Sequence, residues 1–139
     1  MVMGPAAPTN SGLPGFNTRY GIGAHPGGGN ANATQLTGWL NTVTQVATAA
    51  DSVMLPPAYA GCEITVVNAG GASCQVFGYM NTAPGDIVTD TVAPPGSVVQ
   101  GTAGAAVGAG TVAVFFCIIG QGAFTNGITP GQWVARSLS

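Results

Sequence analysis

The sequence predicts an all-β fold, a β-sandwich or more narrowly a jelly roll, with an extended N-terminal arm and one short helix. Three observations predict it. From Ser52 onward, short runs rich in Val, Ile, Thr and Phe recur along the chain, Gly- and Pro-rich turns separate them, and one run of nine residues is apolar almost throughout. Short strands divided by such turns are typical of sandwiches and barrels. The 139 residues are the length of one domain.

Residues 1–31 differ in composition from the rest of the chain. Gly and Pro are frequent there, and both residue types disfavour helices and central strands. Four large apolar residues are nevertheless spaced through the segment: Leu13, Phe16, Tyr20 and Ile22. Because a solvated linker does not need such side chains, we interpret the segment as an extended arm that binds a neighbouring protein through these four residues. A disordered tail is the alternative. Residues 32–139 are expected to form the sandwich domain.

One helix is predicted at about residues 33–47. Its apolar residues follow a helical stripe: Leu36, Trp39, Leu40, Val43, Val46 and Ala47. Asn32, followed three residues later by Gln35, resembles a capping box at its start. The threonines of this segment count against the helix, because β-branched residues have low helix propensity.

Several short strands are predicted between Ser52 and the end of the chain. They are rich in β-branched and aromatic residues, and turn residues bound them. The predicted strands are 53–55, 63–68, 73–78, 86–90, one beginning at 98–99, 111–119 and 132–136. The segments 63–68 and 73–78 are expected to pair as a hairpin, since Ala69, Gly70 and Gly71 supply a turn.

The predicted strand 111–119 is continuously apolar after its threonine. A strand without polar alternation is typical of a position that is covered on both faces. We therefore expect it to be the central strand of the sandwich or to pack one face against another subunit.

The charge content is unusually low. Only 4% of the residues are charged, against about 25% in a typical soluble domain, and lysine is absent. Surface charges keep soluble monomers apart, so this composition indicates a chain that neighbours cover in an assembly. A membrane or low-complexity chain is the alternative, but the candidate span at 105–120 is short and interrupted by glycines.

Two classes of partner are disfavoured by the same composition. The chain has two positively charged side chains, Arg19 and Arg136, which cannot neutralise a phosphate backbone, so no nucleic-acid partner is expected. The acidic pI of about 4.7 and the lack of a basic helix likewise predict no membrane partner.

The cysteines indicate neither a metal site nor a disulfide framework. Cys62, Cys74 and Cys117 are odd in number and form no CxxC motif. Cys74 and Cys117 lie among apolar strand residues, where free cysteine behaves as a small buried hydrophobe. We expect free thiols, synthesis in the cytoplasm, and neither a metal nor a cofactor.

No enzyme is predicted. The single histidine, His25, lies in the arm, and no nucleophile motif accompanies it. Asp86 and Asp90 are four residues apart and would share one face of a strand. Paired carboxylates hydrolyse glycosides, which leaves a glycosidase as the enzymatic alternative. Beside a glycine turn, however, the two aspartates are interpreted as turn and edge residues.

The segment 51–136 resembles a small β-module that recurs in structural proteins of tailed bacteriophages. The stretches that carry the resemblance are Leu55-Pro56, the sequence GCEITVVNAGG at 61–71, Gln75-Val76-Phe77, Gly85-Asp86, VAVFFCII at 112–119 and Gln132-Trp133-Val134. A separate chain of this size is most similar to a capsid decoration or cement protein. Related modules also end tail fibres and spikes.

The resemblance implies a structural role on the outside of a virion. A cement subunit would bind the major capsid protein and copies of itself, as a homo-oligomer, and would stabilise the capsid. The alternative is a tail-fibre, spike or head-fibre component that binds a receptor sugar. Its candidate stacking residues are Trp39, Tyr59, Tyr79 and Trp133.

Overall fold

The computed structural model describes residues 17–27, 29–81, 88–124 and 127–138, and within these ranges the chain is built almost entirely of β-strands. The all-β class is therefore confirmed. The strands are β1 (Thr18–Gly23), β2 (Thr34–Gln35), β3 (Leu40–Gln45), β4 (Ser52–Met54), β5 (Glu63–Asn68), β6 (Cys74–Phe77), β7 (Met80–Asn81), β8 (Val88–Thr89), β9 (Thr91–Ala93), β10 (Ala105–Val107), β11 (Thr111–Ile119), β12 (Gly122–Phe124), β13 (Gly127–Thr129) and β14 (Gln132–Ser137). A 3-10 helix, η1, spans Asn30–Asn32.

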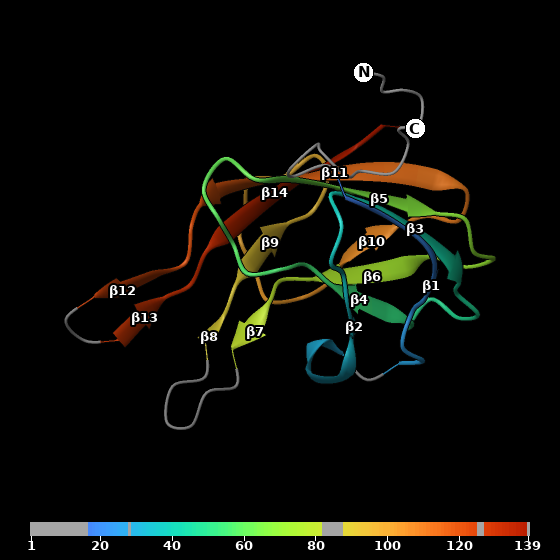
Figure 1. Ribbon diagram of the computed structural model, residues 1–139, viewed down its shortest axis with the longest axis horizontal. Helices are drawn as coiled ribbons and strands as arrows, with labels where there is room; N and C mark the ends of the chain where they lie inside the picture. Colours follow the sequence, from blue (N-terminus) through green and yellow to red (C-terminus); the bar gives the residue numbers. More distant parts are fainter. Residues whose placement is uncertain (1–16, 28, 82–87, 125–126, 139) are drawn as a thin grey trace, which may run out of the picture.

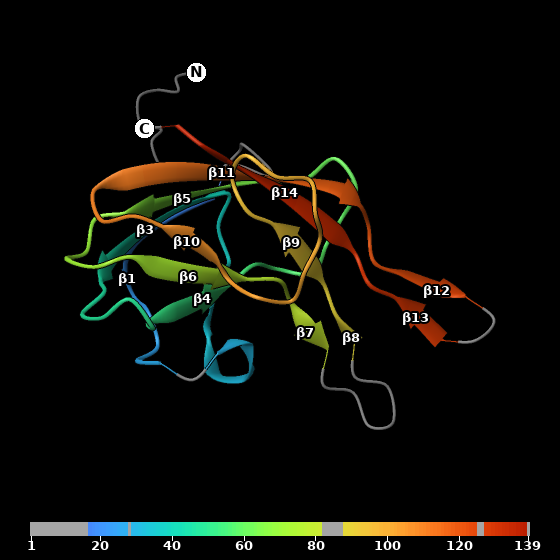
Figure 2. The same cartoon turned by 180° about the vertical axis from the view of Figure 1, so that it is seen from behind.

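Two main sheets form the body of the protein. The larger has the strand order β1-β3-β5-β11-β14-β9, and the smaller has the order β10-β6-β4-β2. Figures 1 and 2 show them as two layers, with the six-stranded sheet uppermost in both views. Two short ribbons, β7–β8 and β12–β13, extend away from this body.

The core lies between these layers and draws residues from both. The six-stranded sheet contributes Val43, Ile64, Val66, Val92, Ala113, Phe115, Cys117, Trp133 and Ala135, and the four-stranded sheet contributes Val53, Cys74, Val76, Ala105 and Val107. Trp133 and Phe115 are the largest fully buried side chains. Because burial of each such side chain contributes about 1.5–3 kcal/mol, this shared core holds the two sheets together.

The central strand β11 confirms the predicted strand at 111–119. It pairs antiparallel with β5 on one side and with β14 on the other. Phe115 and Cys117 point into the core, whereas Val114 and Phe116 alternate with them on the outer face. Val114 is buried and Phe116 is half-buried, but Ile118 is exposed. Only the middle of the strand is therefore covered on both faces.

Both main sheets are mixed. The parallel pairs are β1 with β3, β3 with β5, β14 with β9, β2 with β4, and β4 with β6. A jelly roll is built from antiparallel strands. The all-β class is confirmed, whereas the sandwich and the jelly roll remain predictions.

The predicted hairpin of 63–68 with 73–78 is wrong. Both strands exist, but β5 lies in the six-stranded sheet and β6 in the four-stranded sheet. The buried Asn68 directs the chain between them, because its amide donates to the carbonyls of Ala72 and Val107, each at 2.8 Å, and its oxygen accepts from the Gly70 N–H at 2.9 Å. A Cβ at Gly70 would lie 2.7 Å from Cβ of Val46. The turn therefore crosses the core layer instead of closing a hairpin.

The predicted helix at 33–47 is also wrong, because the segment contains β2 and β3. Val43 and Asn41 are the inward residues of β3, and both are fully buried. The Asn41 side chain donates to the Gly38 carbonyl at 2.8 Å and accepts from the Gly38 N–H at 3.0 Å. Because the buried residue Asn41 is polar, the sequence does not show the apolar–polar alternation of a strand here. Trp39 and Leu40 are exposed, and their spacing only resembles the apolar stripe of a helix.

Part of the predicted arm belongs to the folded body. Residues 18–23 form β1, an edge strand that pairs parallel with β3. The segment 98–99, predicted as the start of a strand, is an exposed loop instead. Of the predicted strand 86–90, residues 88–89 form β8, whereas 86–87 lie outside the described residues. Residues 1–16 also lie outside them.

Candidate interaction surface

The surface of the protein carries very few charges. Asp51 and Asp90 are buried, so the exposed charged side chains of the described residues are Arg19, Glu63 and Arg136. Charge repulsion between copies is correspondingly weak. The surface must therefore be judged by its apolar and neutral polar groups.

Five exposed apolar residues lie at one end of the six-stranded sheet. They are Trp39, Leu40, Tyr59, Ile118 and Ile119, and their exposed fractions run from 40% to 78%. We call this group the apolar end.

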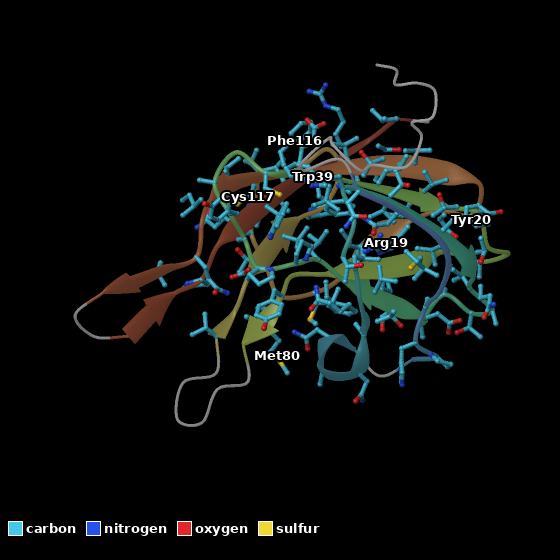
Figure 3. All side chains as sticks on the ribbon, viewed as in Figure 1. Arg19, Tyr20, Trp39, Met80, Phe116 and Cys117 are labelled. Atoms are coloured by element: carbon cyan, nitrogen blue, oxygen red, sulfur yellow. The ribbon has the colours of Figure 1, made fainter. Side chains whose placement is uncertain are left out.

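Backbone hydrogen bonds explain how the apolar end is assembled. The Thr65 N–H donates to the Trp39 carbonyl at 2.7 Å, which sets the start of β3 beside the start of β5. The Gly61 N–H donates to the Cys117 carbonyl at 3.0 Å, which brings the loop before β5 against the end of β11. Figure 3 shows Trp39 and Cys117 on the same part of the molecule. Segments far apart in sequence thus lie next to one another at this end of the sheet.

The outer face of the six-stranded sheet is a second surface, on which apolar and charged side chains lie side by side. Cross-strand register puts Phe116 between Glu63 and Val134, and Val114 between Thr65 and Arg136. The loop of residues 95–98 borders this face and, together with Phe116, Val134, Arg136 and Ser137, lines an open groove of about 700 Å³. We call this the outer groove.

Strand β1 leaves one edge of the six-stranded sheet open, since it is the first strand in the sheet order. Tyr20 on this edge is 82% exposed and lies on β1 away from Trp39 (Figure 3). Arg19 is held along the edge by a bond from its Nε to Oγ1 of Thr37 at 3.1 Å. An unpaired edge offers backbone donors and acceptors to another chain.

Of the four predicted arm residues, the structure describes Tyr20 and Ile22. Tyr20 points to solvent, whereas Ile22 is half-buried and packs against the core. Leu13 and Phe16 lie outside the described residues. Tyr20 therefore remains a candidate contact residue, while Ile22 has a structural role. The sequence reasoning missed the apolar end, although the adjacent pairs Trp39-Leu40 and Ile118-Ile119 were its visible signal.

Of the candidate catalytic residues, the structure describes Asp90 and His25. Asp90 is fully buried and accepts hydrogen bonds from the Ala58 N–H at 2.9 Å, the Gly131 N–H at 2.8 Å and the Gln121 amide at 2.9 Å. These three donors join separate loops, so this carboxylate is structural. Asp86 lies outside the described residues, and His25 is exposed. In the described ranges no cluster of three His, Cys, Asp or Glu side chains is suited to a metal ion.

The four candidate sugar-stacking residues separate into two groups. Trp39 and Tyr59 are exposed, and both belong to the apolar end. Trp133 is fully buried, and its Nε1–H has no hydrogen-bond partner among the described residues. Tyr79 is half-buried. Only Trp39 and Tyr59 are well placed to stack on a ligand.

The three cysteines are free thiols. Burial raises the pKa of Cys74 to about 12 and that of Cys117 to about 11. Burial also raises the pKa of Cys62. A thiol that stays protonated at neutral pH is a poor nucleophile and a poor metal ligand, so these residues act as part of the core.

Asp51 stabilises the turn that leads into β4. The Thr48 hydroxyl donates to its carboxylate at 2.7 Å, and the Ala47 N–H donates to it at 2.7 Å. The Thr48 bond, followed by the Ala47 bond, lowers the pKa of Asp51. The Asp51 carboxylate therefore has a structural role in this turn.

Comparison of the chain with protein-family models, with curated proteins and with solved structures gave no match. No helix within the described ranges is long and apolar enough to cross a membrane.

Proposed function

We propose that this protein is a structural subunit of a bacteriophage virion that binds the outer surface of the capsid and stabilises it as a cement or decoration protein. The observation that supports the proposal is the combination of a surface with very few charges and an exposed apolar end. Large apolar patches on soluble proteins mark sites of protein–protein contact. The resemblance of segment 51–136 to phage structural modules supplies the virion context.

The apolar end contains residue types that anchor protein interfaces. Its five side chains include one Trp and one Tyr, the residue types that dominate binding energy at interfaces. Full burial of each apolar side chain contributes about 1.5–3 kcal/mol. Part of this gain offsets the entropy lost on association, and repetition over a capsid lattice makes modest contacts collectively strong.

The proposed partners are the major capsid protein and further copies of this chain. A ligand that binds only the assembled state stabilises that state by mass action. The proposed role is non-enzymatic and involves neither nucleic acid nor a membrane.

The copy number of the chain in purified virions tests this proposal. Quantitative mass spectrometry of purified particles would give its ratio to the major capsid protein. A cement protein covers the lattice, so we expect a ratio of one or a simple fraction of one. Absence of the chain from the particles would contradict any role in the virion.

A second candidate function is a fibre or spike component that binds sugars. The exposure of Trp39 and Tyr59 favours it, because aromatic faces stack on sugar rings. Fibres are present at a few sites on each particle. A few copies per virion would therefore support the role of fibre or spike component and contradict the role of cement protein.

A further inference from the structure

Cys62, directly before β5, lies opposite Cys117 on β11. The ladder of β5 and β11 pairs Glu63 with Phe116, and beyond this pair the Cys117 N–H donates to the Cys62 carbonyl at 2.9 Å. The Gly61 N–H donates to the Cys117 carbonyl at 3.0 Å, and Gly61 has a φ of 83°. A glycine with positive φ here is typical of a β-bulge, in which two residues, Gly61 and Cys62, oppose one on the partner strand.

The two thiols lie on the same face of the sheet. Side chains alternate along a strand, so Cys62 and Cys117 face away from the side that carries Glu63 and Phe116. Cys117 belongs to the core, and Cys62 packs against it. Burial is the main cause of the raised pKa of Cys117, and the nearby Cys62 adds to it. The ladder and the core packing therefore agree that the two thiols are neighbours.

The spacing of such a pair suits a disulfide. Opposed residues of antiparallel strands have Cα atoms about 4.5–5.5 Å apart, and a disulfide joins Cα atoms about 4.4–6.8 Å apart. The Cys117 thiol instead donates to the Ile119 carbonyl at 3.3 Å, a weak bond that side-chain rotation can replace. Cys74 belongs to β6 in the four-stranded sheet, so the ladder sets it opposite neither of the other two cysteines.

We propose that Cys62 and Cys117 are a thiol pair that a disulfide oxidant, such as oxidised glutathione, converts into a disulfide within one chain. The Cys62 thiol is half-buried and is the more exposed of the two. Its thiolate attacks one sulfur of oxidised glutathione, whose S–S bond breaks, and one glutathione leaves while a mixed disulfide forms at Cys62. The Cys117 thiolate then attacks the Cys62 sulfur and displaces the second glutathione. Two electrons pass to glutathione, and the two cysteine protons end on the two glutathione thiols.

The first step is slow at neutral pH, because burial raises the pKa of Cys62 and only the thiolate attacks. The second step takes place within one molecule, where the neighbouring thiol has a high effective concentration. The two cysteines can therefore persist as poorly reactive thiols under reducing conditions and still form a bond when an oxidant is present.

The bond would link two parts of the apolar end. The Cys62 N–H donates to the Tyr59 carbonyl at 2.9 Å, so Cys62 ends the turn that carries the exposed Tyr59. Cys117 directly precedes Ile118 and Ile119 at the end of β11. Oxidation would thus fix this loop covalently to the end of the central strand.

Oxidation of the purified, folded full-length chain with excess oxidised glutathione at pH 9 tests the proposal. Free thiols are then blocked with N-ethylmaleimide in acidic denaturant, and a protease that cleaves after Glu and Asp separates the cysteines, because Glu63 and Asp90 lie between them. We expect one linked peptide pair, Cys62 with Cys117, in a species of single-chain mass, and a blocked Cys74. Links through Cys74, links between two chains, glutathione adducts alone, or three blocked thiols would overturn the proposal.

Three alanine variants provide the matched comparison, with circular dichroism to show that each is folded. Cys62→Ala and Cys117→Ala should each abolish the disulfide, whereas Cys74→Ala should form it in the same yield as the unmodified chain. The rate in the unmodified chain should rise about tenfold from pH 7 to pH 8, because the thiolate fraction does. A rate independent of pH would contradict attack by a thiolate. The inference concerns one chain alone, so it stands or fails independently of the virion proposal.

Discussion

At the scale of single residues, burial controls the chemistry of the cysteines. Cys74 is a fully buried residue of the shared core. Its thiol must ionise in a medium that solvates a thiolate poorly, which raises its pKa to about 12 from an ordinary value of 9.0. Cys117, near Cys62 and Asp90, is raised to about 11 for the same main reason.

This shift predicts a loss of stability in alkali. Below pH 9 the Cys74 thiol is protonated in both the folded and the unfolded chain, so its effect is constant. Above pH 9 the unfolded chain ionises first, and the free energy of unfolding falls by about 1.4 kcal/mol per pH unit for this thiol. The fall continues until the folded pKa of about 12. Urea unfolding between pH 8 and pH 11 measures the slope.

The matched control is Cys74→Ala, which removes this titration and leaves Cys117 in place. Its stability should be lower at neutral pH because a buried sulfur is lost, but its dependence on pH above 9 should be shallower. An identical slope in both proteins would show that Cys74 does not cause the alkaline loss.

At the scale of elements, β1 is both an edge strand and a part of the core. Ile22 packs on the core, and Ala24, directly after the strand, is buried. The Ala24 N–H donates to the Gln45 carbonyl at 3.0 Å, and the His25 N–H donates to the Ser52 carbonyl at 2.9 Å. These bonds tie residues 18–25 to both main sheets. Within the predicted arm, residues 18–25 are therefore attached to the folded body.

Two deletions distinguish the arm from the strand. Removing residues 2–16 should leave a folded domain, because β1 and its hydrogen bonds remain. Removing residues 2–31 should lower the free energy of unfolding by about 3 kcal/mol or more, since the packing of Ile22 and Ala24 and the hydrogen bonds of β1 are lost. Urea unfolding of both variants measures the difference. Equal stabilities would show that β1 contributes nothing to the fold.

At the scale of the whole molecule, the placement of charged side chains affects how strongly copies of the protein repel one another. Two of the four acidic residues are buried in hydrogen-bonded turns. The exposed surface therefore lacks the repulsion that keeps most soluble proteins apart. The apolar end supplies attraction at a defined place on that surface.

A charge placed in the apolar end should block assembly without unfolding the subunit. Ile118 is 53% exposed, so Ile118→Asp should change the free energy of unfolding little and should lower occupancy on particles at least about tenfold, which corresponds to about 1.4 kcal/mol. Val99→Asp is the matched control, because Val99 is exposed outside the apolar end. Normal occupancy of Ile118→Asp would exclude the apolar end as the capsid contact.

The strands that could be predicted from the sequence are those whose side chains reveal their environment locally. Segments 63–68, 111–119 and 132–136 are β-branched or aromatic, and turn residues bound them, so composition alone indicated β5, β11 and β14. The strand β3 could not be predicted, because asparagine is usually a surface residue and Asn41 occupies an inward position of the strand. Only its contacts with Gly38, made by the folded turn, let it be buried.

The candidate surface depended even more on the tertiary structure. The exposed pairs Trp39-Leu40 and Ile118-Ile119 are far apart in the chain, and the order β3-β5-β11 leaves one strand between the elements that carry them. Likewise, whether an apolar residue such as Trp133 is a ligand contact or a core residue depends on which face of its strand meets the second sheet.

By itself, the sequence determined the all-β class, the low charge and the free thiols, because strand propensity, net charge and cysteine count are properties of composition and local order. The tertiary structure alone decided that β5 and β6 enter different sheets, that residues 18–23 join the body, and that residues such as Trp39 and Ile118 are exposed. These are long-range pairings, and their energy comes from packing between segments that no local pattern relates.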